Sequence, residues 1–267
     1  MKGSISMPRT NDLSEAPRKE LPVFYVLDTS GSMTGARISS LNHAMEECLI
    51  ALQDLAKSNA DAQLKISVLE FNSECKWMTS HGPEPAEDFE YEPLSAGGLT
   101  CLGAALKELN SKLSTHEYLG SMVGSMMPII IFMTDGEPTD DYEDELENIR
   151  NNRWFKYATK IGFAVGDDAN DKVIASVVGN SEAVISTTDL NLFRKLMRFV
   201  TVTASKLVSQ STTSDTAISG AGIVQDAINQ FGLDETITPQ LASNQYNSEP
   251  NTTDDDSGSW DDADDWT

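Results

Sequence analysis

Continuous and alternating apolar stretches mark the strands that this sequence predicts. Residues 23–27 and 128–134 are unbroken apolar runs that are too short for buried helices, so they predict buried strands, the second of them covered on both faces. Residues 64–72 alternate apolar and polar side chains with period two, and residues 76–79 are suited to pair with them in a hairpin. The remaining predicted strands are residues 160–165 and 183–186.

Helices are predicted between these strands, most of them from apolar residues that recur at spacings of three and four. They cover residues 38–55, 104–113, 140–152, 172–178 and 190–207. Strands and helices therefore alternate along the chain, which is typical of a sheet sandwiched between helices. We expect an α/β, Rossmann-like fold with a mainly parallel central sheet, one antiparallel edge strand and flanking helices.

Composition divides the chain into three parts. Residues 1–20 are polar and contain proline, which predicts a flexible N-terminal arm, and residues 21–208 form the expected domain. From Thr212 onward there are 12 acidic residues and no Lys or Arg, so residues 209–267 are expected to be an acidic, largely disordered tail. A weakly amphipathic patch within it, residues 223–231, predicts a short helix that docks on the domain or on another molecule.

The net charge of −23 excludes some classes of partner. Nucleic acids and anionic membranes both require basic surface, so neither is expected to bind. Residues 1–22 contain no apolar segment of signal-peptide length, and no stretch has the roughly 20 apolar residues of a membrane helix, which predicts a cytosolic protein. The three cysteines lack CxxC spacing and are expected to be free thiols.

Oxygen-bearing side chains gather after the first predicted strand. Asp28, Ser30 and Ser32 follow residues 23–27 at alternate positions, and Gly31 permits a tight turn there. Because the chain curls beyond a strand end, these three side chains are able to converge on one point. Carboxylate and hydroxyl oxygens at this spacing suit a hard divalent cation.

Two more residues are expected to join this site. Asp135 follows the apolar run 128–134, and Thr100 lies in a glycine-containing loop before a predicted helix. Ligands of open α/β sheets bind at the carboxyl ends of the strands, where Asp28 and Asp135 are both predicted to lie. We expect Mg²⁺, with Mn²⁺ or Ca²⁺ as alternatives, and an open coordination position that a carboxylate of a protein partner fills.

These segments resemble the von Willebrand factor A domains, which carry a metal-ion-dependent adhesion site. Residues 28–32 (DTSGS) match the family's DxSxS motif, Thr100 matches its distal threonine, and Asp135 matches its distal aspartate. The resemblance covers roughly residues 21–207. It implies a non-catalytic protein-binding module in which the serines contact the metal directly, and the threonine directly or through water. The aspartates often bind it through water, and an Asp or Glu of the ligand completes the shell.

Within the family, three stretches of sequence look most like the bacterial cytosolic TerY-like subgroup, which is associated with tellurium resistance and stress operons. They are LPVFYVLDTSGSM, GGLTCLGAAL and MTDGEPTDD. That resemblance implies an adaptor in a stress-response or signalling system, with a protein kinase or phosphatase as partner.

Two other functions compete with this interpretation. A Mg²⁺-dependent phosphoryl-transfer enzyme would use Asp28 as nucleophile, but haloacid-dehalogenase-like enzymes place a second aspartate where this chain has Ser30. A scaffold would act mainly through the tail, whose tryptophans stand among acidic residues and suit a motif that docks into a basic, apolar groove. The residues of this predicted motif are Trp260, Asp261, Asp262, Asp264, Asp265 and Trp266.

Overall fold

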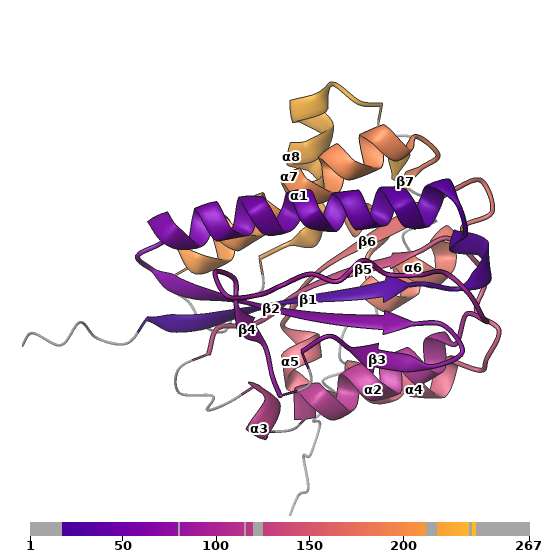
Figure 1. Ribbon diagram of the computed structural model, residues 1–267, viewed down its shortest axis with the longest axis horizontal. Helices are drawn as coiled ribbons and strands as arrows, with labels where there is room; N and C mark the ends of the chain where they lie inside the picture. Colours follow the sequence, from indigo (N-terminus) through magenta and orange to yellow (C-terminus); the bar gives the residue numbers. More distant parts are fainter. Residues whose placement is uncertain are drawn as a thin grey trace, which may run out of the picture.

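A seven-stranded sheet forms the centre of the molecule. The computed structural model describes residues 18–79, 81–114, 116–119, 125–211, 218–234 and 237–238. The strand order is β3-β2-β1-β5-β6-β7, and β4 pairs with the outer edge of β2 beside β3 (Figure 1). The strands are β1 (Lys19–Asp28), β2 (Ala62–Phe71), β3 (Cys75–Trp77), β4 (Glu84–Pro85), β5 (Ile129–Thr134), β6 (Thr159–Val165) and β7 (Val184–Thr187).

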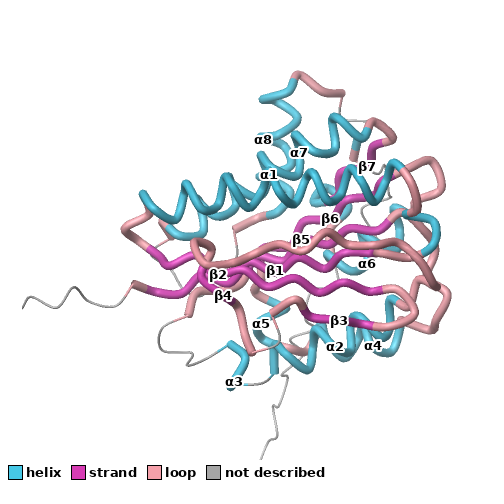
Figure 2. Tube along the Cα trace, viewed as in Figure 1, coloured by secondary structure: helices cyan, strands magenta, loops and turns pink. Residues whose placement is uncertain are grey.

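Helices cover both faces of this sheet. One face is covered by α1 (Ala36–Ser58), α7 (Leu190–Ser209) and α8 (Gly220–Phe231). The other is covered by α2 (Leu102–Ser114), α3 (His116–Leu119), α4 (Glu143–Arg150), α5 (Arg153–Lys156) and α6 (Asp171–Val178). Figure 2 shows the resulting three layers, with the strands between the two sets of helices. Two short 3-10 helices, Gly31–Met33 and Ser181–Ala183, complete the described elements.

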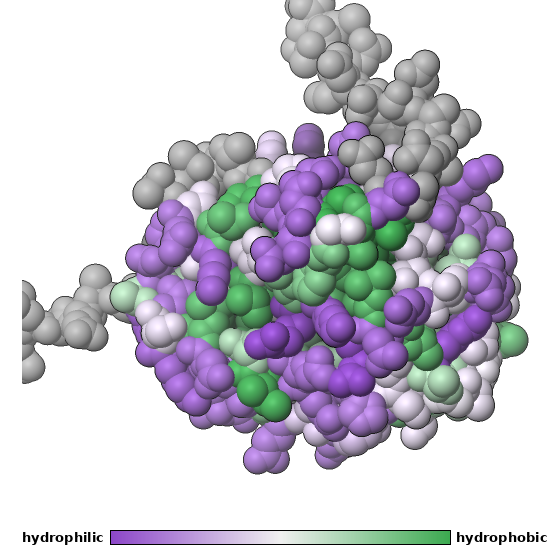
Figure 3. Space-filling view, turned by 90° about the horizontal axis from the view of Figure 1, so that it is seen from above, coloured by the Kyte–Doolittle hydropathy of each residue, from purple (hydrophilic) through white to green (hydrophobic). Residues whose placement is uncertain are grey.

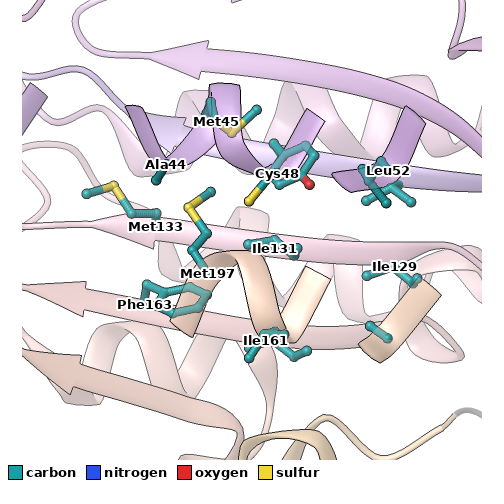
Figure 4. Close-up of a cluster of buried hydrophobic side chains, with 14 of the residues drawn as sticks. Ala44, Met45, Cys48, Leu52, Ile129, Ile131, Met133, Ile161, Phe163 and Met197 are labelled. Atoms are coloured by element: carbon teal, nitrogen blue, oxygen red, sulfur yellow. The ribbon is translucent and has the colours of Figure 1, made fainter. Parts of the chain in front are cut away.

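The alternation of side chains along the central strands builds two cores. In β5, Ile129, Ile131 and Met133 face α1 and α7, whereas Ile130 and Phe132 face the opposite helices. Figure 4 shows the first of these cores, in which side chains from α1, β5, β6 and α7 meet. Because both faces of β5 are buried, its sequence is continuously apolar, and the predicted two-sided covering is confirmed.

The predicted fold class is confirmed. β1, β2, β5, β6 and β7 are parallel, and the antiparallel pairing of β3 with β2 is the predicted hairpin. The structure adds β4, a two-residue antiparallel strand that is not among the predicted strands. Such a short strand has no periodicity of its own, because two residues cannot show a repeat. All three cysteines are free, as expected.

Two domain boundaries differ from the expected ones. β1 begins at Lys19, so the last residues of the predicted N-terminal arm belong to the sheet. α8 lies beyond the predicted end of the domain at residue 208, yet Ile223, Val224 and Ala227 are buried in the core beside α7. Residues 218–234 are therefore part of the folded body and not of a disordered tail. The predicted tail motif, residues 260–266, lies outside the described residues, as do residues 1–17 of the arm.

Within the described part of the chain, no helix combines the length and the apolar composition that crossing a bilayer requires.

Candidate metal centre

The carboxyl ends of β1 and β5 bring the two predicted aspartates to one edge of the sheet. The strands are parallel neighbours, with Leu27 opposite Met133, so Asp28 and Thr134 end adjacent strands side by side. Asp135 follows at once. Asp28 and Asp135 are both fully buried, which is exceptional for carboxylates. Buried carboxylates require hydrogen bonds or charges that stabilise them, and the surrounding residues provide these.

Hydrogen bonds fix both carboxylate oxygens of Asp28. Its Oδ1 accepts a hydrogen bond of 2.7 Å from the backbone N–H of Ser30, and its Oδ2 accepts one from the hydroxyl of Thr134. Burial raises the pKa of Asp28, because a carboxylate removed from water loses solvation energy, and the charge of Asp135 acts in the same direction. The two hydrogen bonds lower the pKa and offset part of that effect. Among the described residues no cation pairs with Asp28.

A chain of hydroxyls connects the first turn to the second aspartate. The Oγ atoms of Ser30 and Ser32 are 2.9 Å apart, and the Ser32 hydroxyl donates a hydrogen bond of 2.7 Å to Asp135 Oδ1. Ser30 is buried, whereas Ser32 is exposed. The oxygen cluster therefore begins inside the molecule and opens to solvent at Ser32.

The glycine loop that carries Thr100 is tied to the same turn through the backbone. Gly97 donates to the carbonyl of Thr29 at 2.8 Å, and Gly31 donates to the carbonyl of Gly98 at 3.0 Å. The approach is so close that a Cβ on Gly31 would lie 3.2 Å from that carbonyl oxygen, and Gly98 has a φ of +81°. Gly98 therefore requires glycine, and a side chain on Gly31 would crowd the neighbouring loop.

Thr100 itself is buried and is held between two loops. Its N–H donates to the hydroxyl of Thr139 at 3.1 Å, and its carbonyl accepts from the N–H of Thr139 at 2.9 Å. Asp140, the next residue, accepts from the first backbone N–H groups of α2, at Gly103 and Ala104. This capping joins the Asp135 loop to the Thr100 loop.

Arg37, near the start of α1, places a positive charge at the edge of this cluster. Its guanidinium donates to Asp135 Oδ2 at 2.7 Å and to Asp168 Oδ1 at 2.5 Å. Gly166 makes room for it, because a Cβ there would lie 2.6 Å from Arg37 Nη2. The bonds to Asp168 and then to Asp135 raise the pKa of Arg37, and the guanidinium lowers the pKa of Asp168.

The donor set fits a small, hard cation. Two carboxylates provide two negative charges, and the hydroxyls of Ser30, Ser32 and Thr100 provide neutral oxygens. The described residues contain no cluster of three or more His, Cys, Asp or Glu side chains that is able to hold a metal, so a site for a transition metal with nitrogen or sulfur ligands is not formed by them. This cluster instead depends on hydroxyls for more than half of its donors.

The structure brings together four of the five predicted ligands by direct hydrogen bonds: Asp28, Ser30, Ser32 and Asp135. Thr100 lies on an adjoining loop, and among the described residues its side chain makes no hydrogen bond to the other four. Thr134 and Arg37 are not among the residues predicted from the sequence. Thr134 directly precedes Asp135 on a strand, which is a usable signal, whereas the position of Arg37 depends on Gly166, over a hundred residues later in the chain.

Comparisons with solved structures show where this fold occurs elsewhere. The chain is similar to a proximal thread matrix protein from the mussel byssus, with a TM-score of 0.52, 16% identity and coverage of 70% of this chain and 48% of that one. A second structure of that protein, at 14% identity, TM-score 0.52 and the same coverages, has a zinc-occupied MIDAS motif. A von Willebrand factor type A protein from Catenulispora acidiphila matches with a TM-score of 0.52 and 16% identity over 69% of this chain and 42% of that one.

These likenesses show the fold, and this chain spans about half or less of the length of the matched proteins. A comparison with curated proteins gave no match. The model of the von Willebrand factor type A domain matches residues 23–198, which is more than half of the chain and includes all five candidate ligands. The chain therefore belongs to the von Willebrand factor type A domain family.

Proposed function

We propose that this chain is a non-catalytic protein-binding module that recognises its partner through a divalent cation. Asp28, Ser30, Ser32, Thr100 and Asp135 would hold the ion, and a carboxylate of the partner would complete its coordination. The observation that carries the proposal is the hydrogen-bonded turn between two fully buried carboxylates: the N–H of Ser30 binds Asp28, the Ser30 hydroxyl lies against that of Ser32, and the solvent-exposed Ser32 hydroxyl binds Asp135. Arg37 compensates the charge of Asp135, but no described cation pairs with Asp28, and a divalent cation would supply that missing charge.

Mg²⁺ is the proposed ion. It prefers carboxylate and hydroxyl oxygens and retains water in part of its shell, which leaves a position that a partner's carboxylate is able to take. Mn²⁺ and Ca²⁺ share the preference for oxygen and are the alternatives. The bound ion would supply a positive charge with an exchangeable ligand position. The residues of this chain would hold the ion in place and exclude water from the side of the ion that faces the protein.

The rim of the site offers an apolar contact for the same partner. Leu99, beside Thr100, is 57% exposed, although large apolar side chains in this protein are mostly buried. The hydroxyl of Ser73 accepts a hydrogen bond from the N–H of Leu99 at 2.9 Å and so fixes the loop. A partner with an apolar side chain next to its Asp or Glu would place the carboxylate on the ion and the apolar side chain on Leu99. This contact would exclude water from the metal-bound carboxylate.

The cellular role is proposed from the resemblance to the TerY-like subgroup alone. On that basis the chain acts as an adaptor in the bacterial cytosol, within a stress-response or tellurium-resistance system, and a protein kinase or phosphatase is its partner.

An enzymatic role for Asp28 has less support. A carboxylate that attacks a phosphoryl group must reach it, but Asp28 is fully buried and both of its oxygens accept hydrogen bonds. Ser30 stands where a second acid would act as proton donor, and a serine hydroxyl does not fill that role.

The proposal is tested by capturing partners on the immobilised full chain in Mg²⁺ and in EDTA. We expect capture to fall at least about tenfold in EDTA, because the partner's carboxylate then loses the cation it binds. The Asp135→Ala chain should capture as little in Mg²⁺ as the wild type does in EDTA. Capture that persists at full strength in EDTA would contradict metal-dependent recognition, even with the fold intact.

A second prediction concerns Arg37, whose charge lies next to the proposed ion. Replacing Arg37 by Met should tighten Mg²⁺ binding by about tenfold at low salt, because a positive charge a few ångströms away opposes a divalent cation. Isothermal titration with MgCl₂ measures the change. The control is Lys57→Met, which removes the same charge from the exposed far end of α1. Weaker binding in Arg37→Met would show that the arginine positions Asp135 for the metal rather than competing with it.

A further inference from the structure

A groove with basic and apolar lining lies between α7 and α8, on the face of the sheet opposite α2. Its volume is about 340 Å³, and its lining includes Lys195, Arg198, Phe199, Val202, Lys206 and Phe231. The first five share one side of α7, at spacings of three and four, and Phe231 is the last residue of α8. One acidic residue, Glu47, also lines the groove, and its charge is compensated by an ion pair with Arg194. Figure 3 looks onto this face of the molecule and shows apolar surface interrupted by hydrophilic side chains.

Two aromatic rings form the apolar part of the groove. Phe199 and Phe231 meet edge to face, with ring centroids 5.6 Å apart, and both remain half-buried. Further along α7, Leu207 is 39% exposed. Partly exposed aromatic rings flanked by cations are suited to an aromatic side chain that carries acidic neighbours.

The cationic side chains of this groove are not engaged in ion pairs within the described part of the chain. Lys195, Arg198 and Lys206 form no ion pair there, whereas Arg194, beside them, is paired with Glu47. The chain as a whole carries 42 acidic and 19 basic residues, so three unpaired cations on one side of one helix are a local exception. They attract an acidic ligand.

The last 14 residues of this chain have the matching chemistry. Residues 254–267 contain seven aspartates, two tryptophans and no basic residue. The described part of the chain also ends near the groove, because Phe231 lines it and Ile237, six residues later, packs against the same core. The 15 residues between Thr238 and Asp254 span up to about 50 Å when extended, which is ample for a return to the groove.

We propose that residues 254–267 dock in cis into the groove between α7 and α8, with Trp260 or Trp266 against Phe199 and Phe231 and the aspartates facing the three cations. Attachment through a short linker gives the segment an effective local concentration in the millimolar range, so weak contacts suffice. This inference is independent of the metal site. It assigns the acidic, tryptophan-containing segment an intramolecular partner, which any external ligand of the segment has to displace.

Fluorine NMR of the full chain labelled with 5-fluorotryptophan tests the docking. Substitutions Trp260→Phe and Trp266→Phe assign the two tail resonances, and Trp77 and Trp154 in the body report whether the fold is intact. We expect at least one tail resonance to be broadened and shifted from its position in the free peptide 254–267. The double variant Lys195→Glu/Lys206→Glu should return it to the free position, and 0.5 M NaCl should move it in the same direction.

The matched control is Lys76→Glu/Lys107→Glu, which reverses two exposed charges on β3 and α2, away from the groove. It should leave the tail resonances in place. Tail resonances at the free-peptide position in the wild type, or insensitive to the charge reversal in α7, would overturn the proposal. A shift that disappears on tenfold dilution would also overturn it, because docking would then join two copies of the chain.

Discussion

The Asp28→Asn variant should lose Mg²⁺ affinity by about 100-fold or more and yet unfold no more easily than the wild type in metal-free buffer. The loss of affinity follows from removing one of only two negative charges in the proposed site. The preserved stability follows from burial, because an ionised Asp28 lies out of contact with water and beside a second carboxylate. A neutral amide of the same size escapes both penalties.

The geometry around Asp28 accepts an amide without rearrangement. The oxygen of the substituted side chain would still accept from the N–H of Ser30, and its NH₂ group would donate to the hydroxyl of Thr134, which is free to rotate and accept. The second N–H of the amide and the hydroxyl hydrogen of Thr134 then lose their acceptors, and this cost is set against the gain from removing a buried charge, so the net change in the free energy of unfolding is small. The variant therefore separates the two roles of this carboxylate, in folding and in metal binding.

Urea unfolding in EDTA and isothermal titration with MgCl₂ measure the two quantities. Asp167→Asn is the matched control, since it removes one carboxylate from an exposed loop at the same edge of the sheet and should change neither. Destabilisation of Asp28→Asn by more than about 2 kcal/mol in EDTA would show that the carboxylate is mainly structural. Unchanged Mg²⁺ affinity would remove Asp28 from the proposed ligands.

Local sequence carries most of the information about the strands and the candidate site. A parallel strand buried on both faces reads as a continuous apolar run, so β1 and β5, and with them the aspartates at their ends, are predicted from composition and length. The turn at residues 28–32 and the glycine loop are local features as well. Hydrogen bonds connect Asp28, Ser30, Ser32 and Asp135 at one edge of the sheet, and their role as metal ligands stays a prediction.

The features that sequence reasoning misses depend on contacts between distant segments. Arg37 reaches Asp135 because Gly166, at the end of β6, leaves the space that its guanidinium fills. No pattern near Arg37 indicates this. Likewise, the single apolar stripe of α8 permits docking on the body or on another molecule, and only the shape of the body shows which of the two occurs.

Glycine explains why α8 belongs to the body. A Cβ on Gly220 would lie 2.1 Å from the carbonyl oxygen of Lys160 in β6 and 3.2 Å from the Cβ of Ala183. Backbone of the helix therefore touches backbone of the sheet, an approach that any side chain would prevent. Four residues of the same helix, Ile223, Val224, Ala227 and Ile228, are then buried against the core.

Replacing Gly220 by Ala should destabilise the protein by about 1–3 kcal/mol, because the added methyl group overlaps a backbone oxygen that cannot move aside. The expected loss is accompanied by faster amide hydrogen exchange in α8, as the helix lifts from β6. Gly222→Ala is the matched control, since its Cβ would meet only Ser219 Cβ, at 3.9 Å. At that exposed helical position alanine should stabilise by about 0.4–1 kcal/mol.

Urea unfolding of the two variants gives free-energy changes of opposite sign if α8 is docked as described, although the substitutions are identical and two residues apart. A shared small gain would mean that α8 does not contact β6 in solution. In that case the folded body would end at α7, and Phe231 would no longer line a groove. The destabilisation by Gly220→Ala therefore decides whether the surface on which residues 254–267 are proposed to dock exists at all.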